Sequence, residues 1–292
     1  MQTIVSADGL RQSFGRKLVL DGVTFALPCG SVTGLIGENG VGKTTLLRIL
    51  LGLREADGGE SRIFGLHSLK RGGAIRRRLG YVPDVYRFNE NITAEEACRF
   101  YAPFYPTWDT VFAAELRERL HLNSAGNINM YSKGMRARLQ LLLALAHHPE
   151  LLILDEPFSG LDPAVRADIL QLLGDYAGAA DRTVMISSHQ FGDLERFCER
   201  VLLLHRGRIC IDDVIDDVRA GRGELTAIFP GQPPAKIDFP GTNVVNTRGR
   251  MATIYYRGDG DALAAQLEAS GATVERNALD LETIFLREVA DV

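Results

Sequence analysis

The sequence predicts an α/β fold in which a parallel sheet carries a binding site at one edge. Two observations predict this fold. A glycine-rich stretch at residues 37–45 lies between a short apolar strand, residues 31–36, and an apolar helix, residues 46–51. Farther along, the apolar run Leu151 to Leu154 ends at Asp155, which is typical of a parallel strand buried on both faces. The ends of such strands meet at one edge of the sheet, where ligands bind.

Residues 37–45 have the spacing G-x-x-x-x-G-K-T of a phosphate-binding loop. Glycine lets the backbone curl until its N–H groups face inward, and the following helix N-terminus adds partial positive charge. Lys43 can then reach the β- and γ-phosphates, and the Thr44 hydroxyl can ligate Mg²⁺. We expect a nucleoside triphosphate to bind to Gly37, Glu38, Asn39, Gly40, Val41, Gly42, Lys43, Thr44 and Thr45.

The composition limits the other functions of the chain. Its 292 residues suffice for one large domain and a smaller one. A net charge of -4 argues against nucleic acid as the main partner. The four cysteines form no C-x-x-C pair, so we expect reduced thiols in a cytosolic protein. No signal peptide is expected, and the longest apolar stretch, Leu141 to Ala146, is too short to span a bilayer, so any membrane part must come from another chain.

The first third of the chain is expected to form short strands. Turns at Asp21–Gly22 and Pro28–Gly30 would separate them. The expected strands are Ile4–Val5, Leu18–Leu20, Val23–Leu27, Arg62–Phe64 and Leu79–Val82.

A helical insertion is expected at about residues 85–148. Thr93 to Glu96 form a capping box that starts one helix. Thr107 can cap a second, from Trp108 to about His121, and Ser132 can cap a third that ends near His147. His147 and His148 are interpreted as residues that close this helix, where cations suit its dipole.

The remainder of the chain continues the sheet and then changes character. Asp162–Pro163 is an N-cap with proline at the first helical position. Thr183–Ser187 and Val201–Leu204 are expected core strands, and Arg206–Gly207 a hairpin turn. Aspartates crowd a short helix near residues 212–217. Strands near 225–229 and 250–256 and a helix at 261–269 then predict a small α+β domain, so we expect domains at residues 1–215 and 222–292.

Two carboxylates follow the buried strand. Asp155 and Glu156 would reach the sheet edge where the phosphate loop lies. Asp155 is placed to hold Mg²⁺, directly or through water. Glu156 is placed to accept a proton from the water that attacks the γ-phosphate, or to orient that water. The sequence therefore predicts hydrolysis as well as binding.

In this order, the motifs of residues 1 to about 215 resemble those of the ATP-binding subunit of an ABC transporter. Residues 37–45 match Walker A, and residues 151–156 match Walker B with its catalytic glutamate. Phe14 matches the aromatic that stacks on adenine, and His189 matches the switch histidine. Residues 159–162 match the D-loop, which includes Asp162.

Three positions depart from the family pattern. The signature L-S-G-G-Q is replaced by Tyr131 to Met135, in which only Ser132 and Gly134 match. Phe158 stands where threonine or serine is usual, and Asp84 where the Q-loop glutamine is expected. The S-K-G-M signature, the acidic Q-loop and a small C-terminal domain resemble the drug- and antibiotic-exporter branch. Asp84 then either contacts the metal or merely caps the turn after Pro83.

The resemblance implies an α/β P-loop NTPase core with an antiparallel β subdomain, the helical insertion and a small C-terminal α+β domain. It implies ATP and Mg²⁺ as cofactors and a second ATPase subunit, identical or different, to which Ser132 contributes in trans. It also implies a polytopic membrane subunit on a separate chain and a peripheral place at the cytoplasmic face of the membrane. The alternatives are a soluble ATPase that acts on nucleic acid or ribosomes, and a nucleotide-binding module without turnover.

Overall fold

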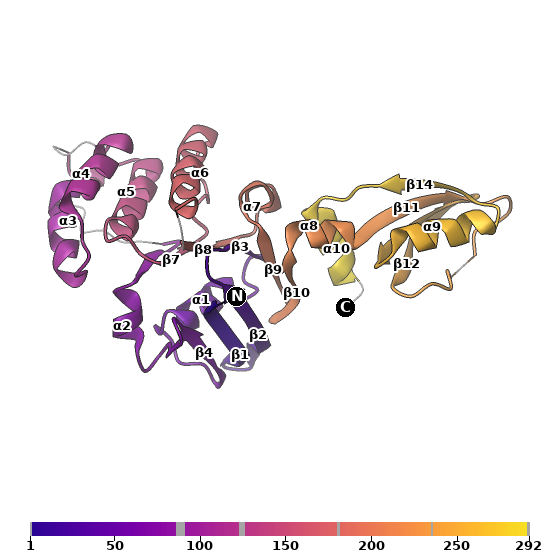
Figure 1. Cartoon of the computed structure of the whole chain (residues 1–292), viewed down its shortest axis with the longest axis horizontal. Helices are drawn as coiled ribbons and strands as arrows, with labels where there is room; N and C mark the ends of the chain where they lie inside the picture. The colour runs from indigo at the N-terminus through magenta and orange to yellow at the C-terminus, as the bar shows by residue number, and fades with distance from the viewer. Residues whose placement is uncertain (1, 86–90, 123–125, 180–181, 235, 291–292) are drawn as a thin grey trace. The chain divides into compact units, whose positions relative to one another are not determined.

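The computed structural model describes residues 2–85, 91–122, 126–179, 182–234 and 236–290. The chain forms two compact units, Met1–Asp212 and Asp213–Val292, each built around its own sheet or sheets. The helices and strands of both are labelled in Figure 1.

A parallel sheet forms the centre of the first unit. Its strand order is β10–β9–β3–β8–β7–β6. β3 pairs in parallel with β8 and β9, and β7 pairs in parallel with β8 and β6. Every residue of β3 and β7 is buried, so the apolar run Leu151 to Leu154 correctly indicated a strand covered on both faces. The strands are β3 (Val32–Ile36), β6 (Leu79–Val82), β7 (Leu151–Asp155), β8 (Thr183–Ser188), β9 (Arg200–His205) and β10 (Arg208–Val214).

A second, antiparallel sheet precedes it, and here the predicted short strands were wrong. Residues 2–28 form only two long strands, β1 (Thr3–Phe14) and β2 (Lys17–Pro28). Gly22 does not break β2, because its positive φ of 74° and that of Gly9, 58°, fall where the pairing register shifts. Such bulges let a strand continue past glycine. The sheet order is β2–β1–β4–β5, with β4 at Gly58–Ile63 and β5 at Leu66–His67.

Helices cover the parallel sheet, and one of them enters the core of the unit. α1 (Lys43–Leu50) buries Leu46, Leu47 and Leu50 in the cluster that also holds Leu35 of β3 and Ile153 of β7. The first turn of α1 is thereby fixed to the strand that precedes it. The other helices here are α2 (Gly72–Arg76), α6 (Pro163–Ala177) and α7 (Phe191–Phe197).

A run of helices lies between β6 and β7 (Figure 1). They are α3 (Ala94–Tyr101), α4 (Thr110–Arg119) and α5 (Lys133–Leu145), with 3₁₀ turns at Ala102–Phe104 and Ile128–Met130. Thr93 and Glu96 form the predicted capping box. The predicted cap at Thr107 was wrong: the Asp109 carboxylate accepts from the Phe112 amide at 2.9 Å, and Thr107 instead donates to the His147 carbonyl at 2.7 Å.

Over the residues that the structure describes, the second unit is a four-stranded antiparallel sheet with three helices. The strand order is β12–β13–β11–β14. Its strands are β11 (Arg222–Ile228), β12 (Thr242–Arg248), β13 (Met251–Arg257) and β14 (Thr273–Asn277), and its helices are α8 (Ile215–Ala220), α9 (Gly260–Ala269) and α10 (Leu281–Ala290). β12 was not predicted, because its residues are exposed or only half-buried and form no apolar run.

A buried carboxylate joins α10 to this sheet. Glu288 is 8% exposed and accepts hydrogen bonds from Arg222 Nε at 2.9 Å, Arg257 Nε at 3.0 Å and the Tyr255 hydroxyl at 2.9 Å. Arg222 and Arg257 are direct cross-strand partners in β11 and β13. Two like charges so placed repel each other, so Glu288 is the counterion that lets them sit side by side.

Candidate functional site

A pocket of about 460 Å³ opens where the phosphate loop, residues 37–45, meets the carboxyl end of β7. It lies wholly within the first unit. The pocket brings together residues that are up to 142 positions apart, since Phe14 and Glu156 both line it. Its lining residues are Phe14, Lys17, Val19, Asn39, Gly40, Gly42, Lys43, Thr44, Thr45, Asp84 and Glu156.

The phosphate loop has the backbone that its glycines predicted. Gly40 and Gly42 have φ of 77° and 120°, values that an L side chain rarely adopts. Gly37 is required for a different reason, because a Cβ there would lie 2.5 Å from the Leu204 carbonyl oxygen of β9. The loop therefore passes tightly over the sheet and delivers Lys43 to the first position of α1.

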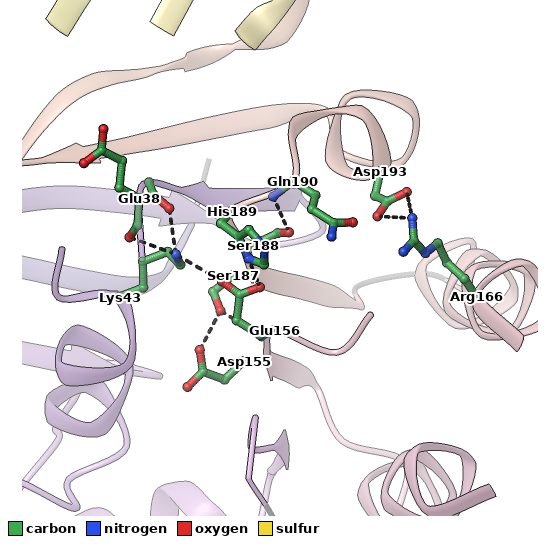
Figure 2. Close-up of polar contacts among 11 residues, drawn as sticks. Glu38, Lys43, Asp155, Glu156, Arg166, Ser187, Ser188, His189, Gln190 and Asp193 are labelled. Atoms are coloured by element: carbon green, nitrogen blue, oxygen red, sulfur yellow. Dashed lines mark hydrogen bonds and ion pairs between the residues drawn. The ribbon is translucent and has the colours of Figure 1, made fainter. Parts of the chain in front are cut away.

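Lys43 is held by oxygen atoms on several sides. Its ammonium donates to the Gly37 carbonyl at 2.7 Å and the Glu38 carbonyl at 3.3 Å, and lies 3.0 Å from a Glu156 carboxylate oxygen. The Lys43 and Glu156 side chains are only 6% and 12% exposed. Figure 2 shows these contacts converging on the ammonium, with the Glu38 carboxylate pointing elsewhere. Lys43 thus already occupies an oxygen-lined position in which a phosphate can replace the carboxylate.

Ser187, near the end of β8, contacts both residues of the 155–156 pair, through the carboxylate of Asp155 and the backbone of Glu156. Its hydroxyl donates to Asp155 Oδ1 at 2.6 Å and accepts from the Glu156 amide at 3.0 Å (Figure 2). Glu156 has a φ of 50°, the left-handed region that is costly for a residue with a side chain. This backbone turns Glu156 toward Lys43 and His189 while Asp155 stays in the strand.

A histidine completes the row of groups beside the pocket. His189 Nδ1 lies 2.8 Å from Glu156 Oε2, so the Glu156 carboxylate bridges Lys43 and His189. The His189 side chain is 34% exposed and sits one residue beyond β8. A carboxylate between a lysine and a histidine can orient a water molecule or receive its proton.

The oxygen donors suit a magnesium ion. Asp155 is 1% exposed, and among the described residues its Oδ2 atom accepts no hydrogen bond. Thr44 lines the pocket in the first turn of α1. Mg²⁺ takes oxygen ligands and usually keeps several waters, so one carboxylate and one hydroxyl beside a triphosphate fit it.

Asp84 lies on the wall of the same pocket, two residues beyond β6. Partial burial, and then the carboxylates of Asp155 and Glu156, raise the pKa of Asp84 above its usual value. Lys133 and His189 offset part of this effect. Asp84 and Glu156 thus line the pocket, and Asp155 is near enough to affect Asp84; together the three carboxylates favour a bound cation.

Phe14 forms another wall of the pocket. It is the last residue of β1, and its side chain is 43% exposed. Its neighbours across the β1–β2 turn, Lys17 and Val19, line the pocket as well. Lys17 and Val19 belong to no local sequence motif, since only the hairpin register brings them beside the phosphate loop.

Some predicted site residues do not line this pocket. Gly37, Glu38 and Val41 belong to the phosphate loop itself, Asp155 and His189 lie at or just beyond strand ends, and Ser132, Gly134 and Asp162 lie at or near the N-termini of α5 and α6. Ser132 caps α5 by accepting from the Met135 amide at 3.2 Å, and Asp162 caps α6 by accepting from the Ala164 and Val165 amides at 3.1 and 3.0 Å. Gly134 allows α5 and α6 to pack closely, because a Cβ there would lie 3.0 Å from a Val165 methyl group. Within one chain, Ser132, Gly134 and Asp162 do not reach the phosphate loop.

An ion pair ties the histidine segment to α6. Arg166 of α6 lies 3.0 Å from Asp193 of α7, with side-chain exposures of 27% and 16% (Figure 2). Asp193 follows His189 by four residues, and Arg166 follows Asp162 by four. The segments that carry His189 and Asp162 are therefore joined by one pair of charges.

Comparison with known proteins gives consistent matches. The family model described as ABC transporter matches residues 20–159. A bacitracin transport ATP-binding protein of Bacillus licheniformis is 33% identical over 75% of this chain and 72% of its own length. A Nod factor export ATP-binding protein of Paraburkholderia xenovorans is 30% identical over 98% of this chain and 97% of its own length. A daunorubicin resistance ATP-binding protein of Streptomyces coeruleorubidus is 30% identical over 76% of this chain and 71% of its own length.

Solved structures agree on the fold. A structure of an ATP-binding subunit of an ABC transporter has a TM-score of 0.68 and 29% identity, and the alignment covers 75% of this chain and 92% of that one. A dimeric ATP-binding cassette bound to ADP and phosphate has a TM-score of 0.66 at 22% identity, over 72% of this chain and 98% of that one. These matches bear out the predicted α/β phosphate-loop fold.

Proposed function

This chain belongs to the family of ABC transporter ATP-binding proteins, and we propose that it hydrolyses ATP to drive a separate membrane protein that exports its substrate. Export is supported by the names of the relatives, which are bacitracin transport, Nod factor export and daunorubicin resistance proteins. These relatives and the net charge of -4 favour transport over the alternative of action on nucleic acid or ribosomes.

One observation carries the proposal: a single pocket is lined by an aromatic ring, Phe14, by the phosphate loop and by the carboxylate of Glu156. Phe14 would stack on the adenine ring. The backbone amides of residues 37–45, with Lys43, would hold the phosphates, and Asn39, Gly40 and Thr45 line the same wall. Thr44 and Asp155 would hold Mg²⁺, which supplies neutralisation of the phosphate charge. Asp84 would accept hydrogen bonds from the water molecules bound to that ion.

Glu156 is the residue that we assign to the chemical step. Its carboxylate bridges Lys43 and His189 at 3.0 and 2.8 Å. When a phosphate takes Lys43, Glu156 becomes available to orient a water molecule and accept its proton. His189 would keep the carboxylate directed toward that water. A positioned base of this kind is worth about 10²- to 10⁴-fold in rate.

A second ATPase subunit would complete each site. Ser132, Gly134 and Asp162 lie away from the pocket of their own chain, at or near the N-termini of α5 and α6. Backbone amides at a helix N-terminus attract a phosphate. We therefore assign these residues to the nucleotide of the partner subunit, with Ser132 facing its γ-phosphate.

A polytopic membrane subunit would bind the helices between β6 and β7. Phe100 and Phe104 are 64% and 60% exposed, and their rings are in edge contact with centroids 5.7 Å apart. In the part of the chain that the structure describes, no helix is long and apolar enough to cross a bilayer. We propose that the chain is held at the cytoplasmic face of the membrane by its partner, through this aromatic pair.

The test is reconstitution with the membrane protein encoded beside the chain. We expect Mg²⁺-dependent ATP hydrolysis that the membrane protein stimulates, and co-purification of the two from detergent. Mixed dimers of a Ser132→Arg chain and a Lys43→Ala chain should keep at most one intact composite site. Full hydrolysis by the Ser132→Arg chain alone would exclude the composite site, and co-purification with ribosomes instead would exclude transport.

A further inference from the structure

Arg54 covers one face of the Phe14 ring. Its guanidinium carbon lies 4.4 Å from the ring centroid, within the range of a cation–π contact. Phe14 lines the nucleotide pocket, whereas Arg54 is not among the residues that line it. Arg54 lines a separate hollow of about 230 Å³ together with Leu10 and Ile49. The Phe14 ring therefore has a cation against one face, and that cation does not occupy the nucleotide pocket.

The position of Arg54 is set by the end of α1. The amides of Leu53 and Arg54 donate to the Arg48 carbonyl, in the last turn of that helix, at 2.9 and 3.2 Å. α1 has eight residues and so spans about 12 Å. Since α1 begins at Lys43, one short helix carries the phosphate loop at one end and anchors Arg54 at the other.

The same loop also grips the strand that carries Phe14. The Asp57 carboxylate accepts from the Ser13 amide at 2.6 Å and from Gln12 Nε2 at 3.1 Å, and the Asp57 amide donates to the Arg11 carbonyl at 2.9 Å. Residues 53–57 thus hydrogen-bond the backbone that precedes Phe14 and also contact its ring through Arg54. Because the backbone is fixed as well, the contact between Arg54 and Phe14 is more than a chance approach of two surface side chains.

We propose that Arg54 is a positioning residue for the nucleotide base: it fixes the Phe14 ring so that the free face of the ring meets the adenine. The proposal rests on the proposed function, in which Phe14 stacks on the base. Phe14 adjoins a two-residue turn and is nearly half exposed, so without Arg54 its ring would lose conformational entropy when the nucleotide binds. Arg54 restricts the ring before binding, which reduces this cost. α1 keeps the ring at a fixed distance from the phosphate loop.

The experiment separates recognition of the base from recognition of the phosphates. Affinities for a non-hydrolysable ATP analogue and for inorganic tripolyphosphate, both with Mg²⁺, are measured by calorimetry on the full chain. Arg54→Ala should weaken the ATP analogue about 3- to 10-fold and leave tripolyphosphate unchanged. In turnover, KM for ATP should rise by the same factor with kcat unchanged, and Arg54→Lys should restore part of the loss.

A matched control is available in the same unit. Arg78 lies 3.9 Å from the ring centroid of Phe64, and neither residue lines the nucleotide pocket. Arg78→Ala should leave the ratio of the two affinities unchanged, although it also removes the ion pair with Glu150. In a Phe14→Ala background, Arg54→Ala should cause no further loss, because the ring that it positions is gone.

The outcomes separate this inference from the proposal beneath it. If Phe14→Ala binds both ligands as the unaltered chain does, stacking of the base on Phe14 is wrong. If Phe14→Ala weakens only the ATP analogue but Arg54→Ala does not, the role of Arg54 is wrong and the stacking stands. An equal loss of tripolyphosphate binding in Arg54→Ala would show a structural effect on the loop and would also overturn the inference.

Discussion

At the scale of single residues, the site is a small set of charges whose states depend on one another. Lys43, Glu156 and His189 form a continuous row, and Asp155 lies beside it with one unbonded oxygen among the described residues. A buried ion pair contributes little net stability, because desolvation offsets most of the attraction. The row is therefore better explained by the chemistry of a bound triphosphate than by the stability of the fold.

Glu156→Gln should abolish most hydrolysis without weakening ATP binding. The amide cannot accept a proton, so the rate should fall by about 10²- to 10⁴-fold. ATP should bind at least as tightly, because the phosphate no longer competes with a carboxylate for Lys43. Filter binding and phosphate release measure the two quantities. Glu38 contacts Lys43 only through its backbone carbonyl, so Glu38→Gln is the matched control and should keep the unaltered rate. A normal rate in Glu156→Gln would remove Glu156 from the mechanism.

His147 should make the fold less stable in mild acid. Its position at the end of a helix predicts a cation, but His147 is 1% exposed, and burial lowers its pKa from 6.5 to about 4. The neutral ring stacks on Tyr105 and contacts the Leu79 carbonyl at 3.2 Å. Below pH 6.5 the unfolded chain binds a proton that the folded chain refuses until about pH 4.

Stability is therefore lost as the pH falls from 6.5 to 4, by up to about 3 kcal/mol. Urea unfolding at a series of pH values measures the loss. His147→Gln should flatten this part of the profile relative to the unaltered chain. Parallel profiles for the two chains would contradict the assignment.

At the scale of elements, the helices, strands and loops that a contiguous stretch of sequence specifies could be predicted, whereas those that depend on strand register or tertiary packing could not. The phosphate loop and β7 were predictable because each is a contiguous pattern with one physical meaning. The bulged pairing of β1 with β2 was not, since the sequence does not specify a register, and Lys17 and Val19 were missed for the same reason. Thr107 and Asp109 can both cap α4, and only packing against His147 decides between them.

The contact between Lys43 and Glu156 joins residues 113 positions apart, so no local pattern could predict that the two meet. The sequence predicted only that both residues lie at the same edge of the sheet. The assignment of Ser132 and Asp162 to a partner subunit remains a prediction, because the described chain places both outside its own pocket.

Arg166→Ala should slow hydrolysis more than it weakens ATP binding. The substitution frees α7 from α6, so His189 is held less firmly against Glu156. It also leaves Asp193 partly buried without its partner, a cost of about 1–2 kcal/mol. Steady-state kinetics and thermal unfolding measure the two effects. Asp193→Asn should reproduce the kinetic defect, and the double substitution should add little to either single one; additive losses would argue against coupling through this pair.

At the scale of the whole molecule, all residues assigned to nucleotide lie in the first unit, and the second has its own apolar core. That core is built from Leu225, Ile254, Leu263 and their neighbours, and it is complete without residues of the first unit. We therefore propose that residues 213–292 are an accessory domain that tunes the ATPase without supplying groups to its site.

A chain that ends at Val214, the last residue of β10, should still fold and bind ATP. This end preserves the six-stranded sheet and removes α8, whose Val218 is fully buried beside β11. Calorimetry with the ATP analogue should give an affinity within about twofold of the whole chain. A truncated protein that is folded by circular dichroism but does not bind ATP would contradict a purely accessory role for the second unit.

The carboxylate of Glu288 has a consequence for the order of events during synthesis. Arg222 and Arg257 leave the ribosome before Glu288 does, and Glu288 follows Arg222 by 66 residues. At about 5–20 residues per second, the nascent β11 waits roughly 3 to 13 s for its counterion. During that interval the first unit already has its full sequence. Once Arg257 has been added, 31 residues before Glu288, the second unit carries two guanidinium groups on adjacent strands that still lack their shared carboxylate. We therefore expect the first unit to fold first, and the accessory domain to close only when α10 becomes available.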